Sequence, residues 1–129
     1  MTTIHDVRRI ALALPETTEK PMYGTPAFRV KDKAFARLRE EGDVLVVWCA
    51  DEDEKDTRIA TEPETFFTLP HYDGYALVLV RLSAMREEAL RHLLTEAWRL
   101  RAPRRLVDAF DADLEAIKTA AGDSVKEIL

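Results

Sequence analysis

Apolar residues recur at helical spacing in three stretches of the chain and alternate with polar residues in the stretches between them. The helical pattern predicts a helix over residues 3–14, where Thr3 and Asp6 are spaced as a capping box and Pro15 follows. It predicts a second helix over 85–100 and a third that begins at Pro103 and stops at Gly122. Each apolar stripe covers one side of its helix, so each helix should pack one side against a core.

The alternating pattern predicts strands in the middle of the chain. Residues 28–31 and 34–39 alternate and should form a hairpin with a tight turn at Asp32–Lys33. Residues 44–49 are continuously apolar, which is typical of a central strand buried on both faces. Shorter patterns predict strands over 65–68 and 75–82. Residues 15–26 and 69–74 are rich in proline and glycine or polar residues and read as loops, and Asp51 begins a short surface helix that ends near Pro63.

The predicted element order is α-β-β-β-α-β-β-α-α. Strands that follow one another in hairpins, instead of alternating singly with helices, indicate an α+β fold with an antiparallel sheet. The sheet should be flanked by the N-terminal helix and the two C-terminal helices. Neither a repeat nor a long linker divides the 129 residues, so we expect a single domain over 1–129.

The composition limits the cellular compartment in which the protein is expected and the classes of partner it can have. The chain has one cysteine, Cys49, which excludes an internal disulfide. Apolar runs are too short for a membrane span, and residues 1–15 lack the apolar core of a signal peptide. We therefore expect a cytoplasmic protein without a membrane partner, and a monomer is favoured.

Charge is distributed unevenly around a net value of −5. Acidic residues are concentrated in 41–65 and 106–129, and the rest of the chain is mildly basic. The basic residues form two clusters, one on the first hairpin and one where the last two helices meet: Arg29, Lys31, Lys33, Arg37 and Arg39, then Arg99, Arg101, Arg104 and Arg105. Such clusters suit DNA or a small anionic ligand, although pairing of these cations with nearby acids is an equally open alternative.

Four aromatic or imidazole side chains are candidates for a pocket that, with an arginine, would hold an anionic ligand: Tyr23, His71, Tyr72 and Trp98. His71 lies in a predicted loop, where it can bind a ligand or simply form a hydrogen bond with the backbone. The acidic segment 51–64 is either a solvated helix surface or a docking edge for a protein partner.

Patterns for catalysis are weak. Cys49 ends the most apolar strand, so a buried and unreactive thiol is favoured over a nucleophile. The sequence has no nucleophile elbow around serine, no glycine-rich phosphate loop and no Cys/His cluster for zinc, and the acidic segment lacks the register of a calcium loop. We expect no catalytic residue, cofactor or metal, and a binding role is favoured over enzymatic activity.

Three blocks of sequence resemble the MmcQ/YjbR-like family. They are Tyr23–Val30 with Lys33–Leu38, Glu62–Tyr75 with Val78–Leu82, and Ala97–Leu106. The resemblance extends over about residues 3–110 and leaves 111–129 as a C-terminal helical extension.

This resemblance implies a compact α+β fold, described for the family as a double wing, and a presumed DNA-binding role without catalytic residues. Among the matched positions, the polar or amphipathic ones carry the functional expectation: Tyr23, Arg37, His71, Tyr72, Arg99 and Arg105. The hairpin around Asp32 would be a wing that contacts phosphate, and Arg99, Arg101, Arg104 and Arg105 would form a second cationic surface. This arrangement requires the two basic clusters to meet in one positive face.

Overall fold

Six antiparallel strands form one sheet in the computed structural model, which describes residues 1–128 and the side chains through residue 120. The sheet order is β1-β2-β3-β4-β6-β5. The strands are β1 (Thr17–Glu19), β2 (Ala27–Val30), β3 (Lys33–Leu38), β4 (Val44–Trp48), β5 (Phe66–Phe67) and β6 (Leu77–Arg81). The helices are α1 (Ile4–Leu12), α2 (Glu52–Thr61), α3 (Glu87–Arg101) and α4 (Arg104–Ile128), with 3-10 turns at η1 (Pro70–Tyr72) and η2 (Leu82–Ala84). The predicted α+β fold with an antiparallel sheet is confirmed.

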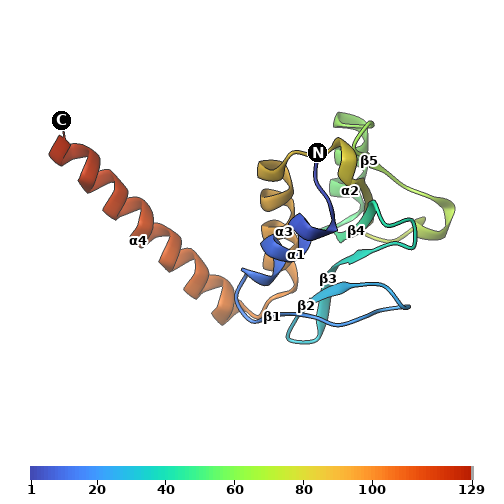
Figure 1. Ribbon diagram of the computed structural model, residues 1–129, viewed down its shortest axis with the longest axis horizontal. Coiled ribbons are helices and arrows are strands. Elements are labelled where there is room, and N and C mark those ends of the chain that lie inside the picture. Colours follow the sequence, from blue (N-terminus) through green and yellow to red (C-terminus); the bar gives the residue numbers. More distant parts are fainter. Residues whose placement is uncertain (129) are drawn as a thin grey trace.

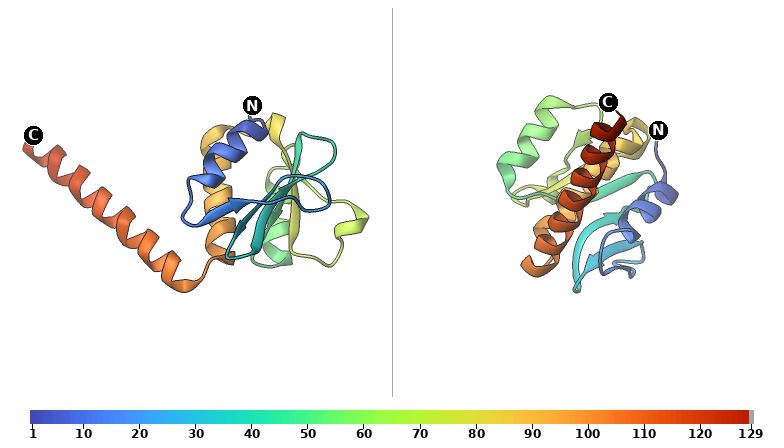
Figure 2. Two further views of the ribbon diagram at one scale, coloured as in Figure 1. Left: turned by 60° about the horizontal axis from the view of Figure 1, so that its bottom comes forward. Right: turned by 90° about the vertical axis from the view of Figure 1, so that its left-hand side faces the viewer.

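One face of the sheet is covered by helices. Helices α1 and α3 lie side by side on it, and α2 packs through Ile59 at the edge formed by β5 and β6 (Figures 1 and 2). The core between sheet and helices contains Phe28, Leu45, Leu90 and Trp98, all fully buried. Strand β4 is buried along almost its whole length, which confirms the expectation for the apolar run at 44–49.

The opposite face carries no helix within residues 1–128, and we call it the open face. Strand pairing places Arg37 of β3 opposite Val46 of β4 and Arg29 of β2 opposite Ala34 of β3, so both arginines belong to this face. The loop that contains η1 partly covers it, with Tyr72 packed on the apolar side chains Val44, Val46 and Leu79. This loop is the yellow-green segment farthest from α4 in Figure 1.

Two local features of the N-terminal half differ from the sequence expectations. Residues 15–26 were expected to be a loop, but they contain β1, which pairs with β2 at the edge of the sheet. The strand is three residues long and polar (TTE), so it leaves no apolar alternation to detect. In the following hairpin the positive-φ turn residues are Lys31 (φ 49°) and Asp32 (φ 66°), one position earlier than predicted.

The last helix begins where proline predicts and continues beyond the predicted stop. The carbonyl of Pro103 accepts hydrogen bonds from the backbone of Leu106 and Val107. Gly122 lies within α4 and does not end it, because a single glycine lowers helix stability by about 1 kcal/mol without removing a hydrogen bond. Helix α4 projects from the rest of the chain (Figures 1 and 2). Within the described residues, no helix is both long and apolar enough to cross a membrane.

Candidate nucleic-acid interface

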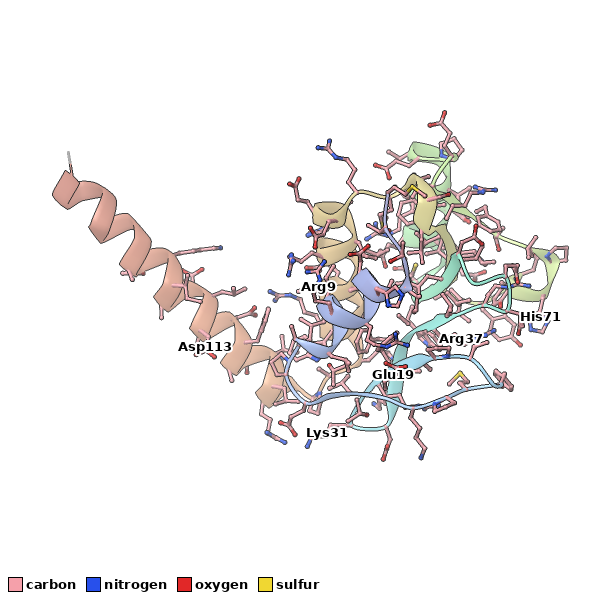
Figure 3. The ribbon with its side chains drawn as sticks, in the orientation of Figure 1. Arg9, Glu19, Lys31, Arg37, His71 and Asp113 are labelled. Atoms are coloured by element: carbon pink, nitrogen blue, oxygen red, sulfur yellow. The ribbon has the colours of Figure 1, made fainter. Side chains whose placement is uncertain are left out.

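A groove of about 430 Å³ lies on the open face, and we call it the aromatic groove. It brings together four residues that the sequence analysis had singled out, namely Tyr23, Arg37, His71 and Tyr72. Figure 3 shows Arg37 and His71 on the side of the molecule away from α4. The remaining lining residues are Met22, Val46, Trp48, Tyr75 and Leu77.

Tyr72 organises the floor of the aromatic groove. It lies in η1, is 5% exposed, and its hydroxyl oxygen accepts a hydrogen bond from Arg37 Nη2 at 3.1 Å. The guanidinium of Arg39 lies 5.7 Å from the centre of the Tyr72 ring, and His71 packs edge-on against the same ring. Arg37 is thereby held in place with its charge facing the groove, and only part of its hydrogen-bonding capacity is used.

Lys55 anchors the loop that carries Tyr72. Although it lies in the most acidic segment of the chain, it is 4% exposed, and its Nζ donates to the backbone carbonyls of Tyr72 (2.7 Å) and Tyr75 (3.0 Å). The sequence analysis missed this role because it considered 51–64 only as a solvated helix surface or as a docking edge for a protein partner. The available signal was spacing, since Lys55 lies four residues before Ile59, on the inward side of the helix.

Tyr23 forms the exposed wall of the aromatic groove. It is 82% exposed and lies with Gly24 in a two-residue turn closed by hydrogen bonds between Met22 and Thr25. Both central residues have positive φ (53° for Tyr23 and 77° for Gly24), which is unfavourable for a bulky side chain. The guanidinium of Arg37 lies 5.4 Å from the centre of the Tyr23 ring. A strained, solvent-exposed aromatic residue beside a cation is a feature found at binding sites.

Trp98 was expected in this pocket, and that expectation is wrong. Its side chain is fully buried on the helix-covered face, where it packs on Phe110 and its Nε1 donates to the carbonyl of Pro15 at 3.1 Å. The apolar stripe of its helix faces the core, and Trp98 belongs to that stripe. The tryptophan that lines the aromatic groove is Trp48, at the end of β4.

The basic residues at the other end of the first hairpin meet the start of α4. Glu16 forms ion pairs with both Lys31 and Arg105, the latter at 3.7 Å, so the two predicted clusters come together there. The hydrogen bond from Lys31 and the charge of Arg105, opposed by partial desolvation, hold the pKa of the Glu16 carboxyl below its ordinary value. We call the cations of this region the cationic corner: Lys31, Lys33, Arg104 and Arg105. Figure 3 places Lys31 close to the base of α4.

The cationic corner is partly neutralised. Arg104 lies 3.8 Å from Asp108, and Glu16 and Asp32 add two more acids. Lys33 is exposed and has no acidic partner among the described side chains. The region therefore has a small excess of positive charge and is not the strongly positive face that the wing arrangement requires.

Three further arginines of the predicted set are engaged in the fold. Arg99 links α3 to α4 through an ion pair with Asp111 and stacks on Phe110 at 5.2 Å. Arg101 donates to the carbonyl of Ala34 at 3.0 Å and lies 5.7 Å from the Trp48 ring, at the margin of the aromatic groove. Arg29 donates to the carbonyl of Asp32 at 3.3 Å.

The thiol of Cys49 is unreactive. Burial raises the pKa of the Cys49 thiol to about 11, so the thiol is protonated at neutral pH and is a poor nucleophile. Among the described side chains, no group of three or more His, Cys, Asp or Glu residues is arranged to hold a metal ion.

Comparison with known proteins adds a family and a fold. A family model described as YjbR matches residues 12–100. Uncharacterised proteins from Mycobacterium bovis and Mycobacterium tuberculosis are 39% identical over 127 residues, which covers 88% of this chain and 98% of theirs. The crystal structure of the Deinococcus radiodurans protein DR2400, with family-model domain DUF419, matches with a TM-score of 0.65 at 22% identity over 78% of each chain. This structural likeness concerns the fold alone.

Proposed function

The chain belongs to the YjbR family, and for this member we propose DNA binding through the open face, with an unpaired base held in the aromatic groove. The observation that carries the proposal is the position of Tyr23. Its ring is 82% exposed on a strained turn, and the guanidinium of Arg37 lies beside it. The contact with Arg37 is the one ring contact recorded among the described side chains and offsets little of the strain of this exposed turn, whereas a stacked ligand would offset more.

The aromatic groove has the chemistry that unpaired bases require. Tyr23, Tyr75 and His71 are all exposed and offer ring surfaces on which a base can stack. Arg37 supplies a charge for a neighbouring phosphate and a planar group for cation–π contact. Stacking is tolerant of base identity because every base has a π face, so binding should show little sequence preference.

The rest of the open face supports a path for the phosphate backbone. Arg29 lies on the same face of the first hairpin, between Arg37 and the cationic corner. The four residues of β2 span about 13 Å, so a single strand leaving the groove along this hairpin would reach Lys31 and Lys33 after a short distance. The acidic helix α2 lies at the other edge of the sheet, which keeps the carboxylates of that helix off this path.

One observation favours a second candidate, a small anionic ligand. A volume of about 430 Å³ is within the range of small-molecule sites, and Arg37 is a suitable partner for a carboxylate or a phosphate. A mononucleotide or an aromatic carboxylate would use the same rings and the same guanidinium. The two candidates differ in whether the residues outside the groove contribute.

A titration with fluorescent oligonucleotides separates these possibilities. We expect a single-stranded oligonucleotide of about 15 nucleotides to bind more tightly than the matching duplex, with affinity falling between about 50 mM and about 200 mM salt. A mononucleotide should compete weakly. A mononucleotide that binds as tightly as the oligonucleotide would favour the small-ligand candidate, and absence of oligonucleotide binding at low salt would refute DNA binding.

A further inference from the structure

The carboxylate of Glu16 bridges two cations that belong to different parts of the chain. Glu16 lies between α1 and β1, Lys31 lies in the turn of the first hairpin, and Arg105 lies in the first turn of α4. One carboxylate oxygen of Glu16, Oε1, contacts Nζ of Lys31, and the other, Oε2, lies 3.7 Å from Nη1 of Arg105. The charge of a single carboxylate is therefore shared between two cations that the fold brings together.

A phosphodiester has the charge and the oxygens to take the place of this carboxylate. Both groups carry one negative charge, and each presents two oxygens that accept hydrogen bonds from separate cationic donors. A hollow of about 330 Å³ leaves room beside Glu16, and its lining includes Lys31 and the hydroxyl-bearing residues Thr17 and Thr18. Asp32 lines the hollow as well, so a singly charged phosphodiester suits it better than a more highly charged anion.

The bridging carboxylate can leave its partners with little loss of stability. The side chains of Glu16, Lys31 and Arg105 are 42%, 43% and 67% exposed, and exposed ion pairs contribute little to the stability of a fold. Glu16 also has a φ of 52°, a conformation that glycine or asparagine adopts more readily. The backbone of this turn therefore favours a smaller residue, and the contact with the two cations is the feature that a glutamate adds.

The hollow lies at the end of the path suggested above for the phosphate backbone, since Thr18 pairs with Arg29 of the open face. We propose that Lys31 and Arg105 form a phosphate subsite, which the Glu16 carboxylate occupies until a phosphate of single-stranded DNA displaces it. The identity of the ligand as DNA rests on the proposed function, whereas the exchange of carboxylate for phosphate rests on the ion pairs. Displacement of Glu16 would raise the positive charge that the cationic corner offers to a bound strand.

Neutralisation of Glu16 should increase the affinity for an oligonucleotide. If the carboxylate occupies the subsite about two-thirds of the time, Glu16→Gln should bind the single-stranded oligonucleotide about threefold more tightly at low salt. The logarithm of the affinity should also fall more steeply with the logarithm of the salt concentration, by up to about 0.7, because one more phosphate is neutralised without a carboxylate being released. Melting curves should show the variant to be as stable as the parent chain.

Two controls locate this gain in affinity. Glu87→Gln makes the same change in net charge and also removes a carboxylate that contacts two arginines, Arg9 and Arg91, but it lies at the start of α3 and should leave affinity unchanged. In a background of Lys31→Gln with Arg105→Gln, the addition of Glu16→Gln should give no gain. Equal gains in Glu16→Gln and Glu87→Gln, or a gain that persists in this background, would overturn the phosphate subsite.

Inorganic phosphate separates the subsite from the proposed DNA binding. In an NMR titration, the backbone amide signals of Lys31 and Arg105 should shift at about threefold lower phosphate concentration in Glu16→Gln than in the parent chain or in Glu87→Gln. Such shifts without oligonucleotide binding would support the subsite and refute the proposed function. Oligonucleotide binding by the parent chain, with no effect of Glu16→Gln on either ligand, would overturn the subsite and leave the proposed function standing.

Discussion

The two faces of the sheet are formed by the same strands but have different roles. On the helix-covered face, Phe28, Leu45 and Trp98 are fully buried, and the side chains that reach the surface are those of the helices. On the open face, Arg37 lies beside Tyr23 and Arg81 lies 4.0 Å from the centre of the Phe67 ring, with both arginines half-buried. Alternation along each strand sends one set of side chains into the helix-covered core and the other to the open face, where arginine–aromatic pairs lie around a smaller apolar cluster.

This difference between the faces indicates which side chains stabilise the fold and which are free to bind another molecule. Burial of large apolar side chains contributes a few kcal/mol each, whereas half-exposed cation–π pairs contribute about 0.5–1 kcal/mol. The arginine–aromatic pairs of the open face therefore add little to the stability of the fold compared with the buried apolar side chains of either face. These pairs leave charged and aromatic groups that another molecule can use, which is the basis of the proposed DNA-binding function.

Removal of a core side chain should produce the largest effect. Trp98→Ala deletes a fully buried ring from the helix-covered face and should lower the free energy of unfolding by about 3–5 kcal/mol. Urea denaturation of the variant and the parent chain measures the difference. A loss below about 1 kcal/mol would show that Trp98 does not belong to the core.

Removal of Lys55, which anchors the loop of Tyr72, should lower both the stability of the fold and the affinity for oligonucleotides. Lys55→Met leaves the carbonyls of Tyr72 and Tyr75 without their Nζ donor and should cost about 1–3 kcal/mol of stability. Because the same loop carries the floor of the aromatic groove, oligonucleotide affinity should fall in the same variant under conditions where it remains folded. A stable variant with unchanged affinity would mean that Lys55 does not order this loop.

The buried thiol should make stability depend on pH in the alkaline range. The thiol of Cys49 loses its proton at about pH 11 when folded, but at about pH 8.5 when unfolded. Between these values the unfolded chain binds fewer protons, so the free energy of unfolding falls as pH rises, by up to about 1.4 kcal/mol per pH unit. Urea denaturation across this range should show a shallower slope for Cys49→Ala. Equal slopes would contradict the burial of the thiol.

Substitution in the cationic corner should have the smallest effect on stability. Arg104 and Arg105 are exposed in the first turn of α4, and their closest carboxylate oxygens are 3.8 and 3.7 Å away. The double variant Arg104→Ala and Arg105→Ala should change stability by no more than about 0.5 kcal/mol, and reduce the salt dependence of oligonucleotide binding. A large loss of stability would identify the two arginines as structural partners of Asp108 and Glu16.

Most helices and strands could be predicted from the sequence because each buries one side against a core. Periodicity identified α1, α3, α4 and the strands β2, β3, β4 and β6, whose apolar residues face a core. Strand β1 was not predicted because its three residues are polar and lie at the sheet edge, where only backbone pairing defines the strand. The extent of α4 past Gly122 also escaped, since a glycine marks a helix end only where the chain turns there.

Only part of the candidate site could be predicted from the sequence. Tyr23, Arg37, His71 and Tyr72 were singled out as amphipathic residues in or beside predicted loops, and they do meet in space. Trp98 was assigned to the pocket, whereas the tryptophan that lines it is Trp48, because the sequence does not show which face of the sheet is covered by helices. Lys55 was missed because its burial depends on two carbonyls from a loop distant in sequence.

Tyr23 is the residue at which stability and binding should separate most clearly. Tyr23→Asn keeps a residue that tolerates positive φ but removes the ring, so stability should stay the same or rise by up to about 1 kcal/mol. Tyr23→Phe keeps both the strain and the ring. Ile117→Ala, at a 65% exposed position on α4, controls for loss of an exposed apolar side chain.

Single-stranded oligonucleotide affinity across these three variants tests the central claim most directly. The stacking of one base contributes about 1–3 kcal/mol, so Tyr23→Asn should weaken binding by about fivefold or more, while Tyr23→Phe and Ile117→Ala bind like the parent chain. An unchanged affinity in a folded Tyr23→Asn variant would contradict the assignment of the open face as the DNA-binding surface.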